Sequence, residues 1–366
     1  MENRILHIMW NMELGGGAER ALYQLVREQR SKGINADILL AHSGGYYAEK
    51  SKETGAVVFE LHQRNNLDLS VRIKFLEILE NYSSVHFHSA ELGLIYLSTK
   101  SKHIKRYYTH RSGWFNYPLK KLFRYKTIGY FLRKYFNGIS GNTRQGAESA
   151  EKLFNFAKDK VITTYNGIDF SLLKPKLNFD VMLNELKLDN SNKVIIGTSA
   201  NLRDWKRIDL LIKSCEKLKS KNIHCLIIGD GENKNELQKL CDTLGLNDII
   251  TFTGRTDCVG NYLQLLDIFV QPSGPEESFG NSVVEAMGFG IASIIMEDGG
   301  GMLEHIENGV SGYVAKDLNN LIDCIKNLID DAELRVKIAE SGKERVHQKY
   351  SLSGLVDRYS KLYNIK

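Results

Sequence analysis

Cysteine, proline and long apolar runs are scarce in this chain of 366 residues. The cysteines are odd in number and form no C-x-x-C pair, so we expect reduced thiols rather than disulfides or a zinc site. No apolar run approaches the roughly 18 residues of a membrane-spanning helix. Residues 5–10 are too short an apolar segment for a secretory signal. The 4 prolines beside 31 glycines are typical of α/β units with tight turns. The five cysteines are Cys215, Cys225, Cys241, Cys258 and Cys324.

Acidic residues are absent between Glu91 and Glu148. The span is basic and rich in aromatic residues, which is typical of surfaces that bind anionic lipid head groups and of surfaces that bind nucleic acid. The same composition is also found in a solvated basic face over an ordinary core. The basic residues of the span are Lys100, Lys102, Lys105, Arg106, Arg111, Lys120, Lys121, Arg124, Lys126, Arg133, Lys134 and Arg144. Its aromatic residues include Tyr107, Tyr108, Trp114, Phe115, Tyr117, Phe123, Tyr125, Tyr130, Phe131, Tyr135 and Phe136. Residues 117–136 are predicted to be helical.

The segment 267–287 predicts a strand, a loop and a helix in succession. Residues 267–270 are apolar, residues 272–280 hold two prolines and two glycines, and helical spacing begins near Asn281. A helix that opens after such a loop binds anions through its free N–H groups and its dipole. Glu276, Glu277 and Glu285 repel a bare phosphate but accept hydrogen bonds from hydroxyls. A nucleotide-sugar, with hydroxyls beside a diphosphate, fits both features.

Glu277 and Glu285 are separated by seven residues, and Ser278-Phe279-Gly280 follows the first. This pattern resembles the E-x7-E signature of the retaining glycosyltransferases of family 4 (glycosyl transferases group 1, bacterial polysaccharide and O-antigen type). The resemblance implies the α/β GT-B fold: two Rossmann-like domains with a cleft between them and a last helix that crosses back. Length also favours two domains, at roughly 150 residues each. We expect domains at 1–172 (acceptor) and 173–347 (nucleotide-sugar), and a returning helix at 348–366.

In the first domain, glycines and strand-end histidines are the candidates. Residues 4–10 are predicted to form a strand that leads into Gly15-Gly16-Gly17, where backbone can approach a ligand closely. By resemblance, Gly16 and Gly17 contact the donor, and Gly15, His110 and Arg111 contact the acceptor. His88 matches a catalytic-cleft histidine. His86 and His88 share one face of a strand, but no third ligand is apparent in the sequence, so we expect no metal.

In the second domain, segment 201–207 resembles the family's Arg-Leu-x-x-x-Lys-Gly segment, whose cations reach the donor diphosphate. Lys206 matches the lysine, while Asn201 and Arg207 stand where the family has arginine and glycine. Arg203 is the candidate for the missing charge. Gly254 and Arg255 are candidate base contacts by resemblance. The backbone of Ser278, Phe279, Gly280 and Asn281 is the candidate cradle for sugar and diphosphate.

The resemblance predicts a retaining hexosyltransferase that uses a nucleotide-sugar, with UDP-sugar favoured, and needs no metal or other cofactor. Glu285 would bind the ribose, Glu277 the hexose, and Lys206 the leaving phosphate. The acidic-free span predicts a polyprenyl-diphosphate-linked glycan acceptor in lipopolysaccharide, O-antigen or capsule biosynthesis. We therefore expect a cytoplasmic protein bound peripherally to the inner membrane face. Two alternatives stay open: a nucleic-acid-binding or DNA-glycosylating protein, and a catalytically silent partner subunit.

Overall fold

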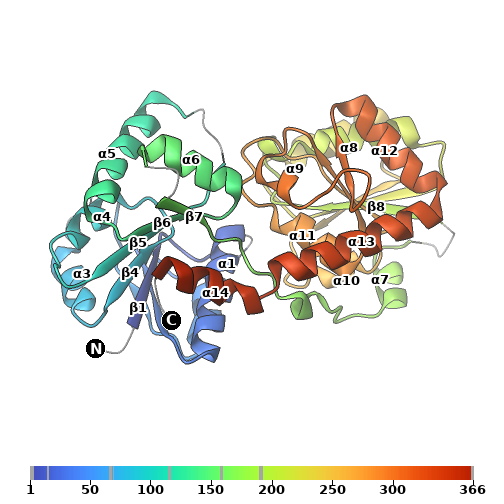
Figure 1. Cartoon of the computed structure of the whole chain (residues 1–366). Coiled ribbons are helices and arrows are strands. Elements are labelled where there is room, and N and C mark those ends of the chain that lie inside the picture. The colour runs from blue at the N-terminus through green and yellow to red at the C-terminus, as the bar shows by residue number, and fades with distance from the viewer. Residues whose placement is uncertain are drawn as a thin grey trace. The chain divides into compact units, whose positions relative to one another are not determined.

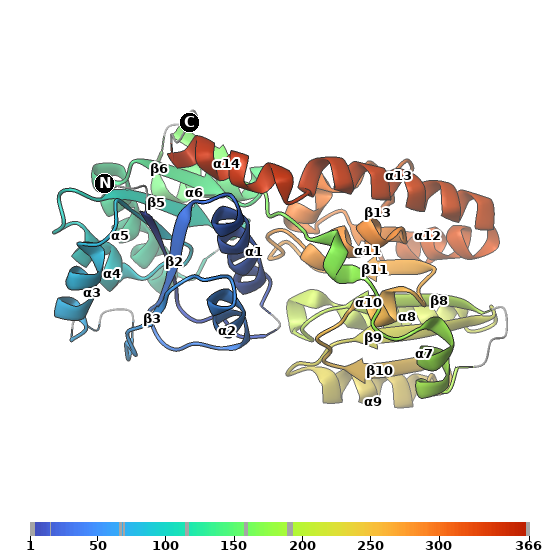
Figure 2. The same cartoon turned by 90° about the horizontal axis from the view of Figure 1, so that it is seen from below.

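The computed structural model describes residues 4–14, 16–65, 68, 70–113, 117–156, 160–188 and 193–363. The chain divides into two compact units, Met1–Gly167 with Leu352–Lys366, and Ile168–Ser351. Each unit contains one parallel sheet with helices packed against it (Figures 1 and 2). The boundaries between the two domains, which we expected after residues 172 and 347, lie after residues 167 and 351.

The first unit is built on a seven-stranded sheet of order β3-β2-β1-β4-β5-β6-β7. The order reverses between β1 and β4, and such switch points are where open α/β sheets bind ligands, at the carboxyl ends of the strands. The strands are β1 (Arg4–Met9), β2 (Asn35–Leu40), β3 (Val58–Glu60), β4 (Ser84–Phe87), β5 (Lys105–His110), β6 (Gly138–Gly141) and β7 (Val161–Thr163). The helices are α1 (Gly17–Ser31), α2 (Tyr46–Lys52), α3 (Arg72–Leu79), α4 (Leu92–Ser98), α5 (Leu119–Tyr135), α6 (Arg144–Phe154) and α14 (Ser353–Tyr363).

Alternation along the strands of the first unit separates two cores. Leu6 and Ile8 of β1 pack with apolar residues of α3 to α6, whereas Ile5 and Met9 face α1, α2 and α14. His7 has the parity of Ile5 and Met9, so it lies on the face that α1 and α14 cover. Helix α14 follows the whole second unit in sequence but belongs to the first, which agrees with the predicted returning helix.

The second unit is built on a six-stranded sheet of order β10-β9-β8-β11-β12-β13, with its switch point between β8 and β11. The strands are β8 (Val194–Ser199), β9 (Ile223–Ile228), β10 (Ile250–Gly254), β11 (Ile268–Gln271), β12 (Ala292–Met296) and β13 (Tyr313–Ala315). The α-helices are α7 (Phe179–Glu185), α8 (Ile208–Leu218), α9 (Lys234–Leu244), α10 (Gly260–Leu263), α11 (Asn281–Phe289), α12 (Leu318–Asp330) and α13 (Ala332–Tyr350). Short 3-10 helices are η2 (Phe170–Leu173), η3 (Asp204–Lys206) and η4 (Gly300–Glu304).

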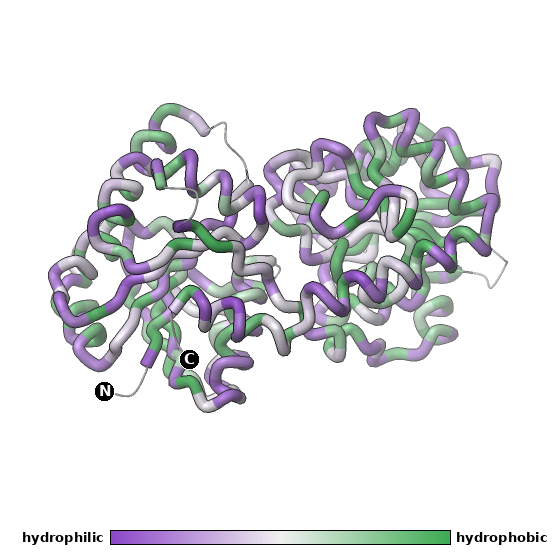
Figure 3. Tube along the Cα trace, in the orientation of Figure 1, coloured by the Kyte–Doolittle hydropathy of each residue, from purple (hydrophilic) through white to green (hydrophobic). Residues whose placement is uncertain are grey.

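Hydrophobic residues concentrate along the strands inside each unit, while polar residues recur on the helices (Figure 3). In the second unit, α8, α9 and α12 pack on one face of the sheet, and the residues of β11 alternate between that core and α11. All five cysteines are free and buried, as expected. In the part of the chain that the structure describes, no helix has both the length and the apolar character needed to cross a bilayer.

Candidate functional site

The predicted strand, loop and helix are present at the switch point of the second unit. Strand β11 ends at Gln271, a loop follows, and α11 begins at Asn281. Gly280 precedes the helix in the left-handed region, at φ 76°. A Cβ at Gly280 would lie 2.5 Å from Cγ of Met302, so both backbone conformation and space require glycine there. The first-turn N–H groups of α11 therefore start directly after a fixed, side-chain-free residue.

Lys206 and Glu277, which the resemblance assigns to the same donor, are in direct contact in the structure. The ammonium Nζ of Lys206 lies 2.5 Å from Oε2 of Glu277, and each side chain is 11% exposed. The same ammonium lies 4.1 Å from the ring centroid of Trp205. The N–H of Gly301, in η4, donates to the backbone carbonyl of Glu277 at 3.0 Å. Glu277 is thus held by its carboxylate to the segment that follows β8 and by its backbone carbonyl to the segment that follows β12.

Glu285 lies on α11, four residues after Asn281 and therefore on the same side of the helix. Its side chain is almost completely buried. Burying a carboxylate is costly unless polar groups compensate for the loss of water. We therefore expect the buried carboxylate of Glu285 to accept hydrogen bonds from polar partners. The two glutamates of the signature are both buried at one end of the sheet, the end where α11 begins.

A buried polar layer links the two strands of the switch point. Gln271 ends β11, and its Nε2 donates to Oγ of Ser273 at 2.7 Å. The hydroxyl of Ser282, in the first turn of α11, donates to Oε1 of Gln271 at 3.2 Å. The hydroxyl of Thr198, on β8, donates to the same oxygen at 3.4 Å. These bonds fix the loop at both its start and its end.

His305 is a functional neighbour that the sequence did not indicate. Its Nε2 lies 2.5 Å from the carbonyl oxygen of Phe279, and its Nδ1 lies 2.7 Å from the hydroxyl of Tyr350. Burial lowers the pKa of His305 to about 3, so the ring is neutral and Nε2 carries the proton that it donates to Phe279. The Phe279 ring packs edge-on against both partners. Phe279 therefore anchors the loop by its side chain and leaves only its backbone for a ligand.

The remaining donor candidates lie nearer to solvent. Arg203 is exposed and lines a surface depression with Asp204, Asn233 and Glu236, while Asn201 is half-buried. Gly254 ends β10 at φ 77°, and its carbonyl accepts a hydrogen bond from the N–H of Gly229 at 2.9 Å.

The other predicted donor contacts are divided between the two units. Arg255 is exposed, and Ser278 and Asn281 are half-buried. Gly16 precedes α1 in extended conformation, with the carboxylate of Glu19 folded against it, and Gly17 is the first residue of α1. Gly15 lies outside the described residues.

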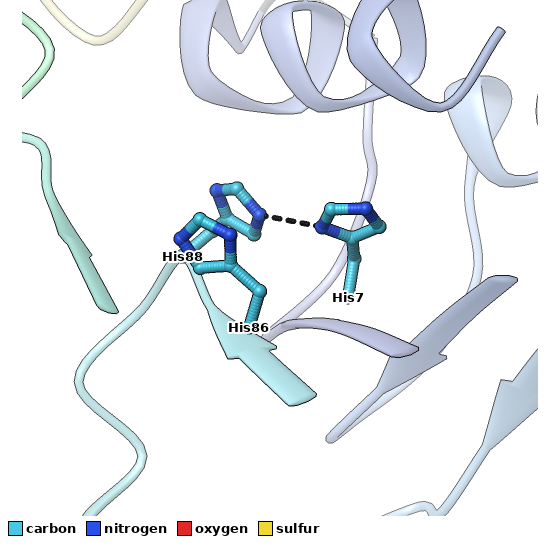
Figure 4. A group of neighbouring side chains, drawn as sticks. All are labelled: His7, His86 and His88. Atoms are coloured by element: carbon cyan, nitrogen blue, oxygen red, sulfur yellow. Dashed lines mark hydrogen bonds between the residues drawn. The ribbon is translucent and has the colours of Figure 1, made fainter. Parts of the chain in front are cut away.

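Three histidines meet in the first unit (Figure 4), where Gln29 of α1 and Tyr363 of α14 contact them. His7 is on β1 and His86 is opposite it on β4, because the parallel pairing of the two strands sets them in register. His88 follows β4, and its Nε2 lies 2.9 Å from Nδ1 of His7. The expectation that His86 and His88 have no third partner was wrong, because His7 lies 79 residues before His86 (86 − 7) and only strand pairing brings it close.

The partners of the rings define their protonation. Arg111 has only donors, so its contact of 3.0 Å makes Nδ1 of His88 an acceptor. His88 then carries its proton on Nε2 and donates to His7, which in turn donates from Nε2 to the side-chain oxygen of Gln29 at 2.8 Å. Burial lowers the pKa of His7 to about 4 and that of His88 well below 6.5, so both are neutral.

One nitrogen atom from each of the three rings lies within 4.8 Å of the other two, which is close enough for a metal. Each ring nitrogen nevertheless already has a hydrogen-bond partner, since His86 binds Tyr363 and Thr109. The guanidinium of Arg111 beside His88 also repels a cation. These contacts oppose metal binding, and the absence of a metal stays a prediction.

His110 and Arg111, at the end of β5, are placed very differently. His110 is 2% exposed, packs edge-on against Tyr125 and Phe154, and contacts the hydroxyl of Ser149 at 3.3 Å. Burial lowers the pKa of His110 to about 4. The ring is thus part of the core, on the opposite face of the sheet from the three histidines, which removes the reason to assign it to the acceptor.

Arg111 lies at the carboxyl end of the sheet, held by neutral groups. Its Nη1 donates to Oδ1 of Asn166 at 3.0 Å and its Nη2 donates to His88. Its Nε is buried and has no hydrogen-bond partner among the described residues. Both partners, Asn166 and His88, are neutral, so neither hydrogen bond compensates the positive charge of the guanidinium. A positive charge fixed by neutral side chains is suited to an anionic ligand.

Helix α5 buries Ile128, Gly129 and Leu132 and exposes the opposite side. Leu119, Phe123 and Tyr130 are 85%, 75% and 51% exposed and recur along one face at helical spacing. Lysines flank that face, and Lys134 lies over the ring of Tyr130. The predicted helix over 117–136 is confirmed with bounds at 119 and 135, while Trp114 and Phe115 lie outside the described residues.

Two family models match the chain. Residues 15–172 match Glycosyltransferase Family 4, and residues 184–345 match Glycosyl transferases group 1. Together they cover both units. The chain belongs to the glycosyltransferase family that contains these two domains. The family assignment, the α/β GT-B fold and the two Rossmann-like domains inferred from the sequence are confirmed.

Relatives of this glycosyltransferase include the N-acetyl-alpha-D-glucosaminyl L-malate synthase of Bacillus anthracis, 28% identical over 55% of this chain and 52% of that protein. The chain thus aligns with about half the length of that relative. The lipopolysaccharide core biosynthesis glycosyltransferase LpsE of Rhizobium meliloti is 23% identical over 95% of each chain. Among solved structures, Anabaena Alr3699/HepE in complex with UDP and glucose superposes with a TM-score of 0.85, at 17% identity over 99% of this chain and 100% of that one.

Proposed function

We propose that this glycosyltransferase moves a hexose or N-acetylhexosamine from a UDP-sugar to a glycan acceptor, with retention of configuration, in cell-surface polysaccharide biosynthesis. One observation carries the proposal: the buried contact of 2.5 Å between Lys206 and Glu277 beside the start of α11, with Glu285 buried one turn into that helix. A fixed cation, a helix N-terminus and two carboxylates together match a diphosphate flanked by hydroxyls.

The donor would be bound by groups with distinct tasks. Glu285 accepts hydrogen bonds from the ribose hydroxyls, and Glu277 accepts from the hexose through the oxygen that Lys206 leaves open. Lys206 and the first-turn N–H groups of α11 stabilise the charge that develops on the diphosphate as the sugar–phosphate bond breaks. In this proposal lysine and helix dipole do the work that a metal does in other transferases, so the reaction proceeds without added cation.

Retention follows from attack on the face that the phosphate leaves. The acceptor oxygen forms the new bond to the anomeric carbon, the bond to the phosphate oxygen breaks, and that oxygen takes the proton of the acceptor hydroxyl. No side-chain base is then required. His88 is consistent with this course, because both its ring nitrogens are engaged with His7 and Arg111 and it serves to hold Arg111.

UDP is favoured as the nucleotide because the similar Anabaena structure is a complex with UDP and glucose. The Bacillus anthracis relative is an N-acetyl-alpha-D-glucosaminyl L-malate synthase, which supports an N-acetylhexosamine as the sugar. The experiment is calorimetric titration with UDP, GDP and ADP without metal, repeated with Glu285→Ala for the nucleotide that binds. We expect UDP to bind and the variant to weaken binding by about tenfold or more. Binding by none of the three would remove the donor assignment.

The acceptor is proposed to carry a phosphate, as a polyprenyl-diphosphate-linked glycan does. Arg111 supports this, since its guanidinium has neutral partners only among the described residues. Arg111→Gln should raise KM for a phosphorylated acceptor by about tenfold or more and leave KM for the UDP-sugar unchanged. An equal KM for phosphorylated and dephosphorylated acceptors with the wild-type enzyme would contradict the phosphate assignment.

A lipid-linked acceptor requires the enzyme to reach a membrane, and the exposed face of α5 is proposed to do so from the cytoplasmic side. Its aromatic and aliphatic residues can enter the head-group region while the lysines meet anionic lipid. The test is sedimentation with phosphatidylglycerol vesicles. Phe123→Glu should reduce binding, and the matched control Val336→Glu, on α13 where Val336 is 54% exposed, should not. Absence of binding refutes the membrane role, and salt-sensitive binding to duplex DNA instead would favour a nucleic-acid acceptor.

A further inference from the structure

Arg207 occupies a backbone conformation that favours glycine. Its φ is 50° and its ψ is 40°, in the left-handed region, and it follows η3 directly before α8 begins. A side chain at such a position strains the backbone, whereas glycine adopts it freely. The strain is maintained only where the side chain makes contacts that compensate for it.

The guanidinium of Arg207 makes four hydrogen bonds to two other segments. Nε donates to the carbonyl of Pro272 at 2.8 Å, and Nη2 donates to the carbonyl of Ser273 at 2.9 Å. Asp298 accepts from both terminal nitrogens, at 2.9 Å from Nη1 and 2.6 Å from Nη2. This bidentate geometry suits arginine and cannot be reproduced by lysine.

Each segment that Arg207 joins also contributes to the Lys206–Glu277 pair. Lys206 is the residue before Arg207, and the N–H of Gly274 donates to the carbonyl of Trp205 at 2.8 Å. Glu277 lies four residues after Ser273, and its N–H donates to the carbonyl of Gly274 at 3.1 Å. Asp298 lies in the loop that leads from β12 into η4, and Gly301 of η4 donates to the Glu277 carbonyl. Arg207 therefore ties together the loops after β8, β11 and β12.

We infer that Arg207 is a positioning residue for glycosyl transfer: its guanidinium fixes the loop 272–277 so that Lys206 and Glu277 are held in place before the donor binds. The inference rests on the proposed function, because the pair that Arg207 holds is the one that would meet the leaving phosphate and the hexose. Arg207 itself bonds to backbone and to Asp298, so its effect on the reaction is through the loop.

Arg207→Gly separates this role from a stabilising one. Glycine suits the φ of 50°, so the variant should melt no lower than Arg207→Ala, which keeps the backbone strain and lacks the same bonds. With water as the acceptor of the sugar, we expect kcat for UDP release from UDP-glucose or UDP-N-acetylglucosamine to fall about 10- to 100-fold in Arg207→Gly, with a smaller change in KM. Arg207→Lys should recover little of the lost kcat, because an ammonium group lacks the paired N–H donors of the guanidinium. Arg335→Ala is the matched control, since Arg335 also bonds a backbone carbonyl, that of Leu328, and lies near Asp267.

Amide hydrogen exchange gives a readout that does not depend on turnover. The N–H groups of Gly274, Glu277 and Gly301 should exchange faster in Arg207→Gly than in the wild type and remain unchanged in Arg335→Ala. Unchanged exchange at these amides, or full kcat in Arg207→Gly, overturns the positioning role. A wild-type enzyme that turns over neither UDP-sugar removes the proposed function instead, and faster exchange in the variant would still confirm that Arg207 fixes the loop.

Discussion

The Lys206–Glu277 pair permits a prediction that separates stability from activity: removing both charges should restore part of the stability that each single substitution loses, but none of the activity. Both side chains are 11% exposed and their charged atoms are 2.5 Å apart. Removing one partner leaves the other charge nearly buried without a counter-ion, which costs about 3–5 kcal/mol. Glu277→Gln and Lys206→Met should therefore each lower the unfolding free energy of the second unit by an amount of that order.

The double variant Lys206→Met with Glu277→Gln leaves no charge in the site. Its loss of stability should be smaller than the sum of the two single losses by about 2 kcal/mol or more. Activity should not follow this recovery, because the cation for the leaving phosphate and the acceptor of the hexose hydroxyls are both gone. All three variants should lose at least about 100-fold in kcat/KM.

Urea unfolding followed by Trp205 fluorescence measures this prediction directly. Trp205 is the tryptophan of the second unit, and Lys206 lies 4.1 Å from its ring centroid. Replacing Trp10 and Trp114, which belong to the first unit, with phenylalanine isolates the signal. Single variants that unfold at the wild-type midpoint would refute the argument that burial makes the pair interdependent, and a double variant with restored activity would refute the catalytic assignment.

Other predictions test separate parts of the chain. The folded-state pKa of His7 is about 4, below the 6.5 of an exposed histidine, because burial disfavours the charged ring. As the pH falls, the unfolded chain therefore binds a proton before the folded protein does. The resulting stability, on the order of 3 kcal/mol, should be complete above pH 6.5 and lost as the pH falls to about 4, and the urea midpoint measures this loss. Gly280→Ala should destabilise by about 1–3 kcal/mol and weaken UDP binding in calorimetry, because φ is 76° and Met302 fills the space. Arg203→Gln should weaken UDP binding by up to about tenfold, while Lys221→Gln, which removes an exposed pair with Asp330, should not; equal affinities would remove Arg203 from the donor site.

Local patterns predicted what is local in the structure. The apolar run at β11, the glycine-rich loop and the helical spacing after Asn281 gave the strand, the loop and the start of α11, because each depends on neighbours in sequence. The resemblance to a family assigned Lys206 and Glu277 to one donor, but it did not predict their direct contact, which joins residues 71 positions apart. Neither segment, taken by itself, indicates that the two side chains are in contact.

What the sequence did not predict depends on packing between distant elements. His7 meets His86 because β1 and β4 pair in one particular register. His305 reaches Phe279 because η4 folds over the start of α11 and α13 brings Tyr350 to its other side. His110 shares the strand-end position of a ligand group but faces α5 and α6, since the parity of β5 decides its side. Each outcome follows from a register or a helix position that composition does not encode.

The charges around the start of α11 explain why Asn201 need not abolish a donor site. Lys206 faces Glu277 and Arg207 faces Asp298, so these four side chains sum to zero before a ligand binds. A diphosphate must therefore find its attraction in the helix N-terminus, worth about half a charge, in the two remaining N–H donors of Lys206, and in Arg203. An arginine at 201 would add one charge to this set, whereas the ordered pair at 2.5 Å supplies position. A cation at this place would meet both the charge that the bound diphosphate already carries and the charge that develops as the sugar–phosphate bond breaks, so the substitution should lower donor affinity and turnover together.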